Sequence, residues 1–116
     1  MSRAKWNVLM ADVALARADN ERALGLLQEA SRQDSDESAE DAAYQRHCEA
    51  LERLDGVIAE ALALEAPDAD ALKWKLATIR AYCVDGDPPS FVESALPAVL
   101  AEVIAFLDRA EVKAGR

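Results

Sequence analysis

The chain has 116 residues, and 52% of them are hydrophobic although only 5% are aromatic. This much apolar surface excludes a disordered chain, and the length predicts a single all-helical domain over residues 1–116. The net charge of −9 argues against binding of nucleic acid and of anionic membrane surfaces, because both are bound through clustered Lys and Arg.

The first predicted helix spans residues 3–33, because apolar residues recur there every three and four positions. Asn20 falls in the same stripe, where it either fixes the helix register or loosens the seam, and we prefer the second interpretation. Gly25 costs about 1 kcal/mol against alanine in a helix and suggests a close crossing by another helix. The stripe consists of Trp6, Leu9, Val13, Ala16, Ala23, Leu27 and Ala30.

The second predicted helix spans residues 38–65 and follows an acidic segment at 34–41. Ser38 and Asp41 have the spacing of a capping box, and acidic residues at a helix N-terminus complement the helix dipole. The acidic segment is therefore the turn of an antiparallel helical hairpin. The apolar stripe of this helix consists of Tyr44, Leu51, Leu54, Ile58 and Ala61.

A third helix is predicted over residues 69–84, after Pro67 ends the second one. Asp68 or Asp70 is expected to cap it. Its expected core stripe consists of Leu72, Leu76, Ile79 and Cys83, while Trp74 and Tyr82 lie off that line.

A fourth helix is predicted to begin at 91 or at 96 and to end near 112. Ser90 and Glu93 match a capping box, and Pro97 either kinks the helix or occupies the first position of a main helix. We prefer the second arrangement. The expected core stripe consists of Leu96, Val99, Leu100, Val103, Leu107 and Ala110. Together the elements predict a small antiparallel all-α bundle of about four helices, built on the long hairpin.

The residues that could carry chemistry are few. His47, Cys48 and Cys83 could form a nucleophilic or metal site, but adjacent helical residues point about 100° apart and no paired Cys or His motif is present. The acidic segment also fails the spacing of a calcium loop. We therefore expect no catalytic residue, no metal and no cofactor, and we expect that the protein is not an enzyme.

Three aromatic residues are candidate interface anchors, namely Trp6, Trp74 and Tyr82, because Trp and Tyr are enriched in binding hot spots. Core packing or capping of the bundle ends is the competing interpretation. Lys73 and Lys75 flank Trp74, which suggests an exposed or half-exposed position for that ring.

Trp6-Asn7, Glu65-Ala66-Pro67-Asp68 and the segment from Ala71 to Leu76 resemble a group of small, alanine-rich helical proteins of alphaproteobacteria. These proteins are uncharacterised, and some come from prophage-like regions. The resemblance implies a bacterial, cytoplasmic protein and brings no activity with it. It also suggests that the acidic segment is a variable insert.

The expected function is a non-catalytic module for protein–protein interaction or self-association, including a dimer, and a phage-derived accessory or regulatory role would fit. The alternative is a bundle that binds a small hydrophobic ligand in an apolar pocket. No apolar run looks long enough to cross a bilayer, and the start of the chain lacks the apolar core of a signal peptide. We therefore expect a cytoplasmic location and no contact with a membrane.

Overall fold

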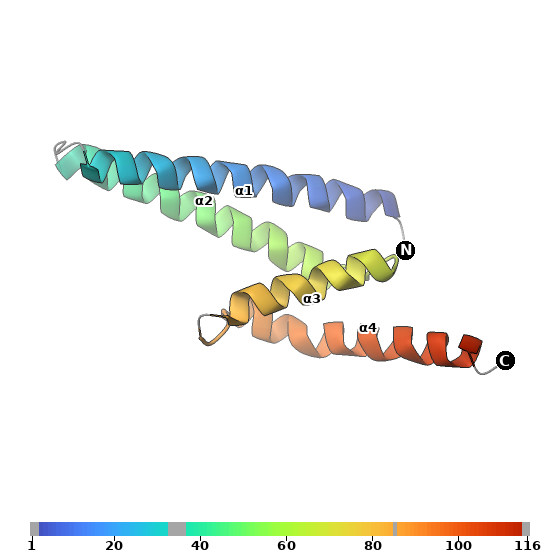
Figure 1. The fold of residues 1–116 in the computed structure, drawn as a ribbon. Coiled ribbons are helices and arrows are strands. Elements are labelled where there is room, and N and C mark those ends of the chain that lie inside the picture. The colour runs from blue at the N-terminus through green and yellow to red at the C-terminus, as the bar shows by residue number, and fades with distance from the viewer. Residues whose placement is uncertain (1–2, 33–36, 85, 115–116) are drawn as a thin grey trace. The chain divides into compact units, whose positions relative to one another are not determined.

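The computed structural model describes residues 3–32, 37–84 and 86–114 and contains four helices in this part of the chain. They are α1 (Arg3–Arg32), α2 (Glu37–Ala63), α3 (Ala69–Cys83) and α4 (Ser90–Ala114) (Figure 1). The predicted all-α class and the predicted hairpin of two long helices are confirmed. Of the acidic segment 34–41, which was expected to form the turn of the hairpin, residues 37–41 lie in α2, and residues 34–36 lie outside the described part.

Contacts between residues divide the chain into two compact units. Residues 8–58, which we call the hairpin unit, contain most of α1 and α2. Residues 1–7 and 59–116, which we call the C-terminal unit, contain the start of α1, the end of α2, and α3 and α4. In the C-terminal unit α3 and α4 form an antiparallel pair (Figure 1).

In the hairpin unit, the stripe predicted on α1 is confirmed. The residues of this stripe that lie in the hairpin unit, of which Leu9 is the first and Ala30 the last, are all buried or half-buried. The stripe on α2 is only partly right, because Tyr44 and Leu51 are exposed. Leu54 and Ile58 of that stripe are buried, as predicted. The half-buried residues between positions 43 and 58 are Ala43, His47, Cys48, Ala50, Asp55 and Val57.

Two residues that interrupt the α1 pattern have different environments. Asn20 is half-buried, and its Oδ1 atom has no hydrogen-bond partner among the described residues. A Cβ atom built on Gly25 would meet no described atom within 4 Å, apart from the neighbours in its own helix. The close helix crossing predicted at Gly25 is therefore wrong, because this glycine faces open space.

The helix ends follow the sequence signals only in part. Asp68 is the N-cap of α3, as one of the two predicted alternatives, and its Oδ1 accepts a hydrogen bond of 2.9 Å from the amide of Ala71. Ser38 and Ser90 are not caps, since both lie within helices. The carbonyl of Pro89 instead accepts the first amide hydrogen bonds of α4.

Pro97 lies inside α4, which is a single helix from Ser90 onward, so the preferred arrangement with a main helix starting near 96 is wrong. Proline removes an amide donor and leaves the carbonyl four residues earlier without its helical partner. That carbonyl belongs to Glu93, and both Glu93 and Pro97 are exposed. Water can therefore bind the freed carbonyl, which makes the proline tolerable at this position.

The core faces of α3 and α4 differ from the predicted stripes. On α3 the buried residues are Ala71, Leu72, Lys75, Thr78 and Ile79. Leu76 and Cys83, which were predicted to lie in the core, are exposed. On α4 the inward face consists of Val92, Leu96, Val99, Val103 and Phe106, whereas Leu100, Leu107 and Ala110 are exposed, contrary to prediction.

The glycines provide a test of the helix geometry. Gly25 and Gly56 both lie within helices with space for a Cβ atom, so Gly25→Ala and Gly56→Ala should each raise the free energy of unfolding by about 0.5–1 kcal/mol. Gly86 has a φ of 130°, so Gly86→Ala should lower it. Urea unfolding measures all three. A loss of stability in Gly25→Ala would contradict the open space assigned to that position.

Candidate functional site

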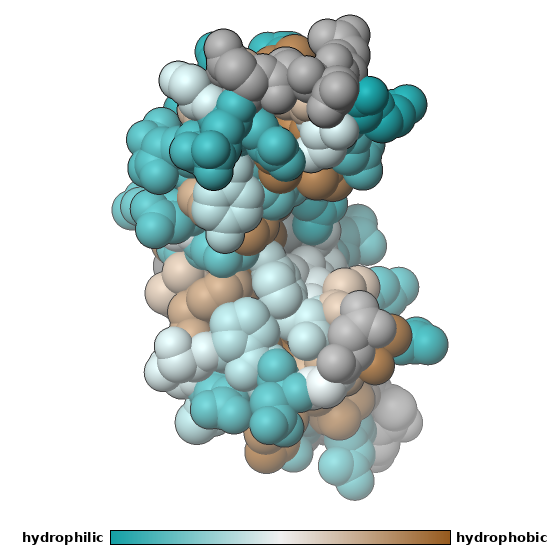
Figure 2. Space-filling model, turned by 90° about the vertical axis from the view of Figure 1, so that its left-hand side faces the viewer, coloured by the Kyte–Doolittle hydropathy of each residue, from teal (hydrophilic) through white to brown (hydrophobic). Residues whose placement is uncertain are grey.

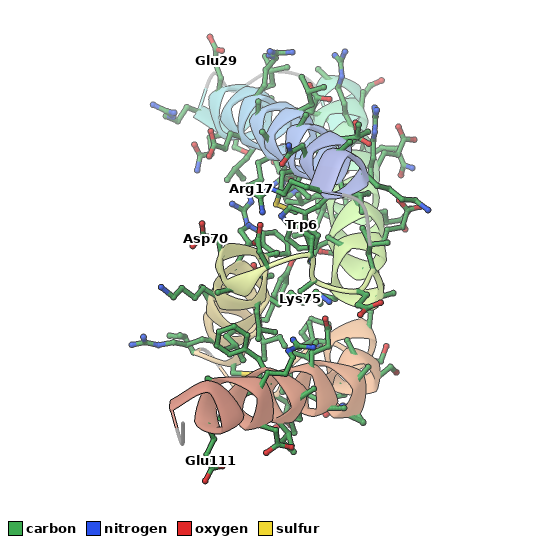
Figure 3. All side chains as sticks on the ribbon, turned by 90° about the vertical axis from the view of Figure 1, so that its right-hand side faces the viewer. Trp6, Arg17, Glu29, Asp70, Lys75 and Glu111 are labelled. Atoms are coloured by element: carbon green, nitrogen blue, oxygen red, sulfur yellow. The ribbon has the colours of Figure 1, made fainter. Side chains whose placement is uncertain are left out.

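Lys75 is the most unusual residue of the C-terminal unit, because its side chain is fully buried although lysine is almost always exposed. It lies in the middle of α3, between Ala71 and Leu72 on one side and Thr78 and Ile79 on the other. In Figure 3 its side chain lies between the helices, on the side where Trp6 is found. A buried ammonium group is stable only when its charge and its donors are satisfied.

Three acceptors satisfy the three N–H donors of the Lys75 ammonium group. Nζ donates to the carbonyl of Leu62 at 3.2 Å and to the carbonyl of Leu64. It also donates to Oε1 of Glu102 at 2.5 Å and forms an ion pair with it. The site is therefore complete in both hydrogen bonds and charge.

The Lys75 group also caps the C-terminal end of α2. The last carbonyls of a helix have no partner within the helix and form the negative end of its dipole. Helix α2 has no basic residue in its own last turn. Lys75 of α3 supplies the missing cation, so a side chain from the next helix in the chain closes the end of α2.

Glu102 of α4 extends the same network to the loop between α2 and α3. Its second oxygen, Oε2, accepts a hydrogen bond of 2.6 Å from the amide of Ala66. The Lys75–Glu102 pair thus connects the end of α2, the following loop, α3 and α4. We call this set of contacts the Lys75 centre.

Trp6 brings the start of α1 to the same place. Its ring is buried and packs edge-to-face on Trp74, with ring centroids 5.5 Å apart and an interplanar angle of 83°. Lys75 Nζ lies 6.0 Å from the Trp6 ring centroid, at the limit of a cation–π contact. Arg3, one turn earlier, pairs with Asp68 at 2.5 Å.

The three aromatic residues proposed from sequence as interface anchors all lie in the C-terminal unit. Trp6 is buried, while Trp74 and Tyr82 are half-buried. Tyr82 packs edge-to-face on Phe91 with ring centroids 5.4 Å apart, which links α3 to the start of α4. Each of the three rings thus has an aromatic partner within the chain.

A surface groove of about 390 Å³ lies beside the Lys75 centre. Three carboxylates line it, those of Glu65, Asp68 and Glu102, together with Arg109. Two of the carboxylates are already committed, since Asp68 caps α3 and pairs with Arg3, and Glu102 binds Lys75 and Ala66. The groove is consequently connected to the structural network. The rest of its lining is apolar and consists of Ala66, Pro67, Ala69, Leu72, Ala105 and Phe106.

The residues considered for chemistry in the sequence lie in different units. His47 and Cys48 are half-buried on α2, and Cys83 is exposed at the end of α3 in the other unit. A hydrogen bond with the Cys48 thiol raises the pKa of Tyr44 above its usual value. Within the described ranges, no three His, Cys, Asp or Glu side chains are grouped so that they could hold a metal ion.

A second groove, of about 340 Å³, lies on the hairpin unit. Arg22, Arg46 and Arg53 line it, with Asp19 and Glu49 between them. Asp19 pairs with Arg22 at 3.6 Å and with Arg53 at 4.0 Å. This groove is also charged and does not match the apolar cavity that a hydrophobic ligand requires.

The outward side of α4 carries an apolar surface without charges. Leu100, Ile104 and Leu107 are 52%, 60% and 58% exposed, and they follow each other at intervals of four and three residues. Glu102 is the only ionisable residue from Ser94 to Leu107, and it is bound to Lys75. The outer face of α4, as we call it, consists of Pro97, Leu100, Ala101, Ile104 and Leu107, which are all exposed.

Figure 2 shows that hydrophobic residues reach the surface of the molecule among hydrophilic ones. Such exposure is ordinary for single residues, but three large aliphatic side chains on one helix stripe form a continuous patch. An uncharged patch is notable in a chain in which 30% of residues are charged.

The segment Ser90–Glu111 of α4 is also long and apolar enough to cross a membrane by length and composition, and little of it is buried. The expectation that no apolar run is long enough for this overlooked the segment, because Glu93, Pro97 and Glu102 interrupt its apolar runs. One such helix is weak evidence of a membrane protein. In this chain α4 packs on α3, and Glu102, near its middle, is paired with Lys75.

Sequence reasoning missed Lys75 and Glu102, although each had a signal. Lys75 has apolar or small residues at the four positions that share its helix face, three and four residues away on either side. Glu102 is the lone charge in a stretch of fourteen residues. A charge in such a setting is expected to have a partner.

Comparisons with protein-family models, with curated proteins and with solved structures gave no match to this chain.

The Lys75 centre can be tested by paired substitutions. Lys75→Met and Glu102→Gln should each lower the free energy of unfolding by about 3–5 kcal/mol, because each leaves one charge of the pair without its counter-charge. The double variant Lys75→Met, Glu102→Gln should lose less than the sum of the two, since it leaves no lone charge. Urea unfolding gives the values.

Lys73→Met is the matched control for this experiment. Lys73 is exposed on the same helix, so its loss should change the free energy of unfolding by less than about 0.5 kcal/mol. An equally small effect of Lys75→Met would contradict the structural role assigned to Lys75.

Proposed function

We propose that this protein is a non-catalytic helical module that binds another protein through the outer face of α4. The observation that carries the proposal is the uncharged, exposed stripe of Leu100, Ile104 and Leu107. All three side chains are more than half exposed, and contiguous exposed apolar patches often mark interaction sites. An exposed helix stripe of this spacing is the usual surface for packing against a second helix.

A catalytic role finds no support in the buried ionisable groups. The donors of Lys75 are all used by Leu62, Leu64 and Glu102, so its side-chain nitrogen is not available as a nucleophile. Both oxygens of Glu102 are used as well. These groups hold helices together, which is the requirement of a binding scaffold.

The ligand-binding alternative has less support than the interaction module. Apolar ligands are bound in cavities with mostly hydrophobic walls. The groove on the hairpin unit is lined mainly by charged side chains, and the groove beside the Lys75 centre combines its apolar residues with four charged ones. A bacterial, cytoplasmic adaptor, including a phage-derived accessory factor, is compatible with the proposed binding role.

Site-specific photo-cross-linking in cells of the native host tests the proposal. A photo-reactive amino acid in place of Ile104 should give a discrete cross-linked product, either with another protein or with a second copy, because this position would lie within the interface. The same amino acid in place of Arg80, an exposed polar residue of α3, is the control. The absence of a product at 104, or the same products at both positions, would contradict the proposal.

A further inference from the structure

Acidic residues lie at both ends of the outer face of α4, whereas its centre is apolar. Glu93 continues the stripe at its start, four residues before Pro97, and Glu111 continues it four residues after Leu107. Asp108 lies beside the stripe near the same end as Glu111. All three carboxylates are exposed, and Figure 3 shows Glu111 projecting outward from α4. The stripe is therefore apolar in its middle and acidic at both ends.

We infer from these observations that the outer face of α4 binds one amphipathic helix of a different protein. That helix is apolar in its middle and has Lys or Arg at both ends. This inference rests on the function proposed above. The apolar anchors of that helix would pack on Leu100, Ile104 and Leu107. Its basic ends would meet Glu93 on one side and Asp108 and Glu111 on the other. Glu93 and Glu111 are separated by roughly 27 Å along the helix axis, which sets the spacing of the basic residues to about 18 positions.

The charges decide between this partner and a second copy of the chain. An antiparallel pairing of two such stripes places Glu93 opposite the Glu111 of the other copy. A parallel pairing places each acidic residue opposite itself. Like charges face each other in both symmetric arrangements, and two chains of net charge −9 repel each other on approach.

The same acidic residues disfavour binding of α4 to the surface of a bilayer. Helices that lie on membranes usually carry Lys and Arg on their polar side, which are attracted to anionic lipids. Helix α4 instead presents Glu93, Asp108 and Glu111 beside its apolar surface. A basic-ended helix gains attraction at the positions where a membrane or a second copy meets repulsion.

Fluorescence anisotropy with two labelled synthetic peptides tests the inference on the full-length protein. Both peptides carry the same Leu and Ile anchors in a helix-forming sequence, one with Lys at both ends and the other with Glu. The Lys-ended peptide should bind about tenfold more tightly at low salt, because each exposed ion pair contributes a factor of roughly 1.5–5. The difference should shrink as the salt concentration rises. Equal binding of the two peptides, or binding of neither, would overturn the inference.

Variants separate the apolar from the ionic contribution. Ile104→Ser should weaken the binding of the Lys-ended peptide by about tenfold or more, because it removes an interface anchor. The matched control is Leu15→Ser, which removes an equally exposed aliphatic residue from α1 and should leave binding unchanged. Exchanging the acidic ends, in Glu93→Lys with Glu111→Lys, should reverse the preference in favour of the Glu-ended peptide. A preference that survives the exchange contradicts the charge assignment.

Two further measurements distinguish failure of this inference from failure of the proposed function. In sedimentation of the protein alone, we expect a monomer; a dimer that is lost in Ile104→Ser would overturn the inference and leave the interaction module standing. In co-sedimentation with phosphatidylglycerol–phosphatidylethanolamine vesicles, we expect no binding. Binding that depends on Ile104 would overturn both the inference and the proposed protein partner.

Discussion

A lysine ammonium group can be removed from water only if other groups replace both its hydration and its counter-charge, and the C-terminal unit is organised around that requirement. Lys75 obtains two carbonyls from the end of α2 and a carboxylate from α4. The burial penalty of such a pair can exceed its Coulombic gain, so it adds little stability compared with an apolar core. It does specify geometry, because each partner must occupy one position for the charge to be satisfied.

The geometry of the Lys75 centre also determines which side of α4 faces solvent. Glu102 must point toward α3 and the loop at Ala66, so the opposite side of the helix faces outward. That side contains Leu100 and Ile104. The internal ion pair thereby holds the one charged side chain in the middle of the helix on its inner side. The outer side of the helix there is apolar. The structural site and the proposed binding surface are two sides of one helix.

The class of fold and the positions of the helices followed from apolar spacing and turn residues, because these are local properties of the sequence. The same spacing identified the buried face of α1, where Trp6 begins the stripe. It was only partly right on α3, where Leu72 and Ile79 are buried as expected but Lys75 is buried and Leu76 is exposed. Single-sequence periodicity cannot distinguish two overlapping faces when a lysine occupies one of them. The choice depends on Leu62, Leu64 and Glu102, which are distant in the sequence.

The burial of Lys75 is tested most directly by nuclear magnetic resonance of the lysine side-chain ammonium groups in the native protein. A buried ammonium group with three acceptors exchanges its protons slowly with water, whereas exposed lysines exchange quickly. We expect one slowly exchanging ammonium signal that disappears in Lys75→Met and remains in Lys73→Met. Fast exchange at every lysine would contradict the central role of Lys75.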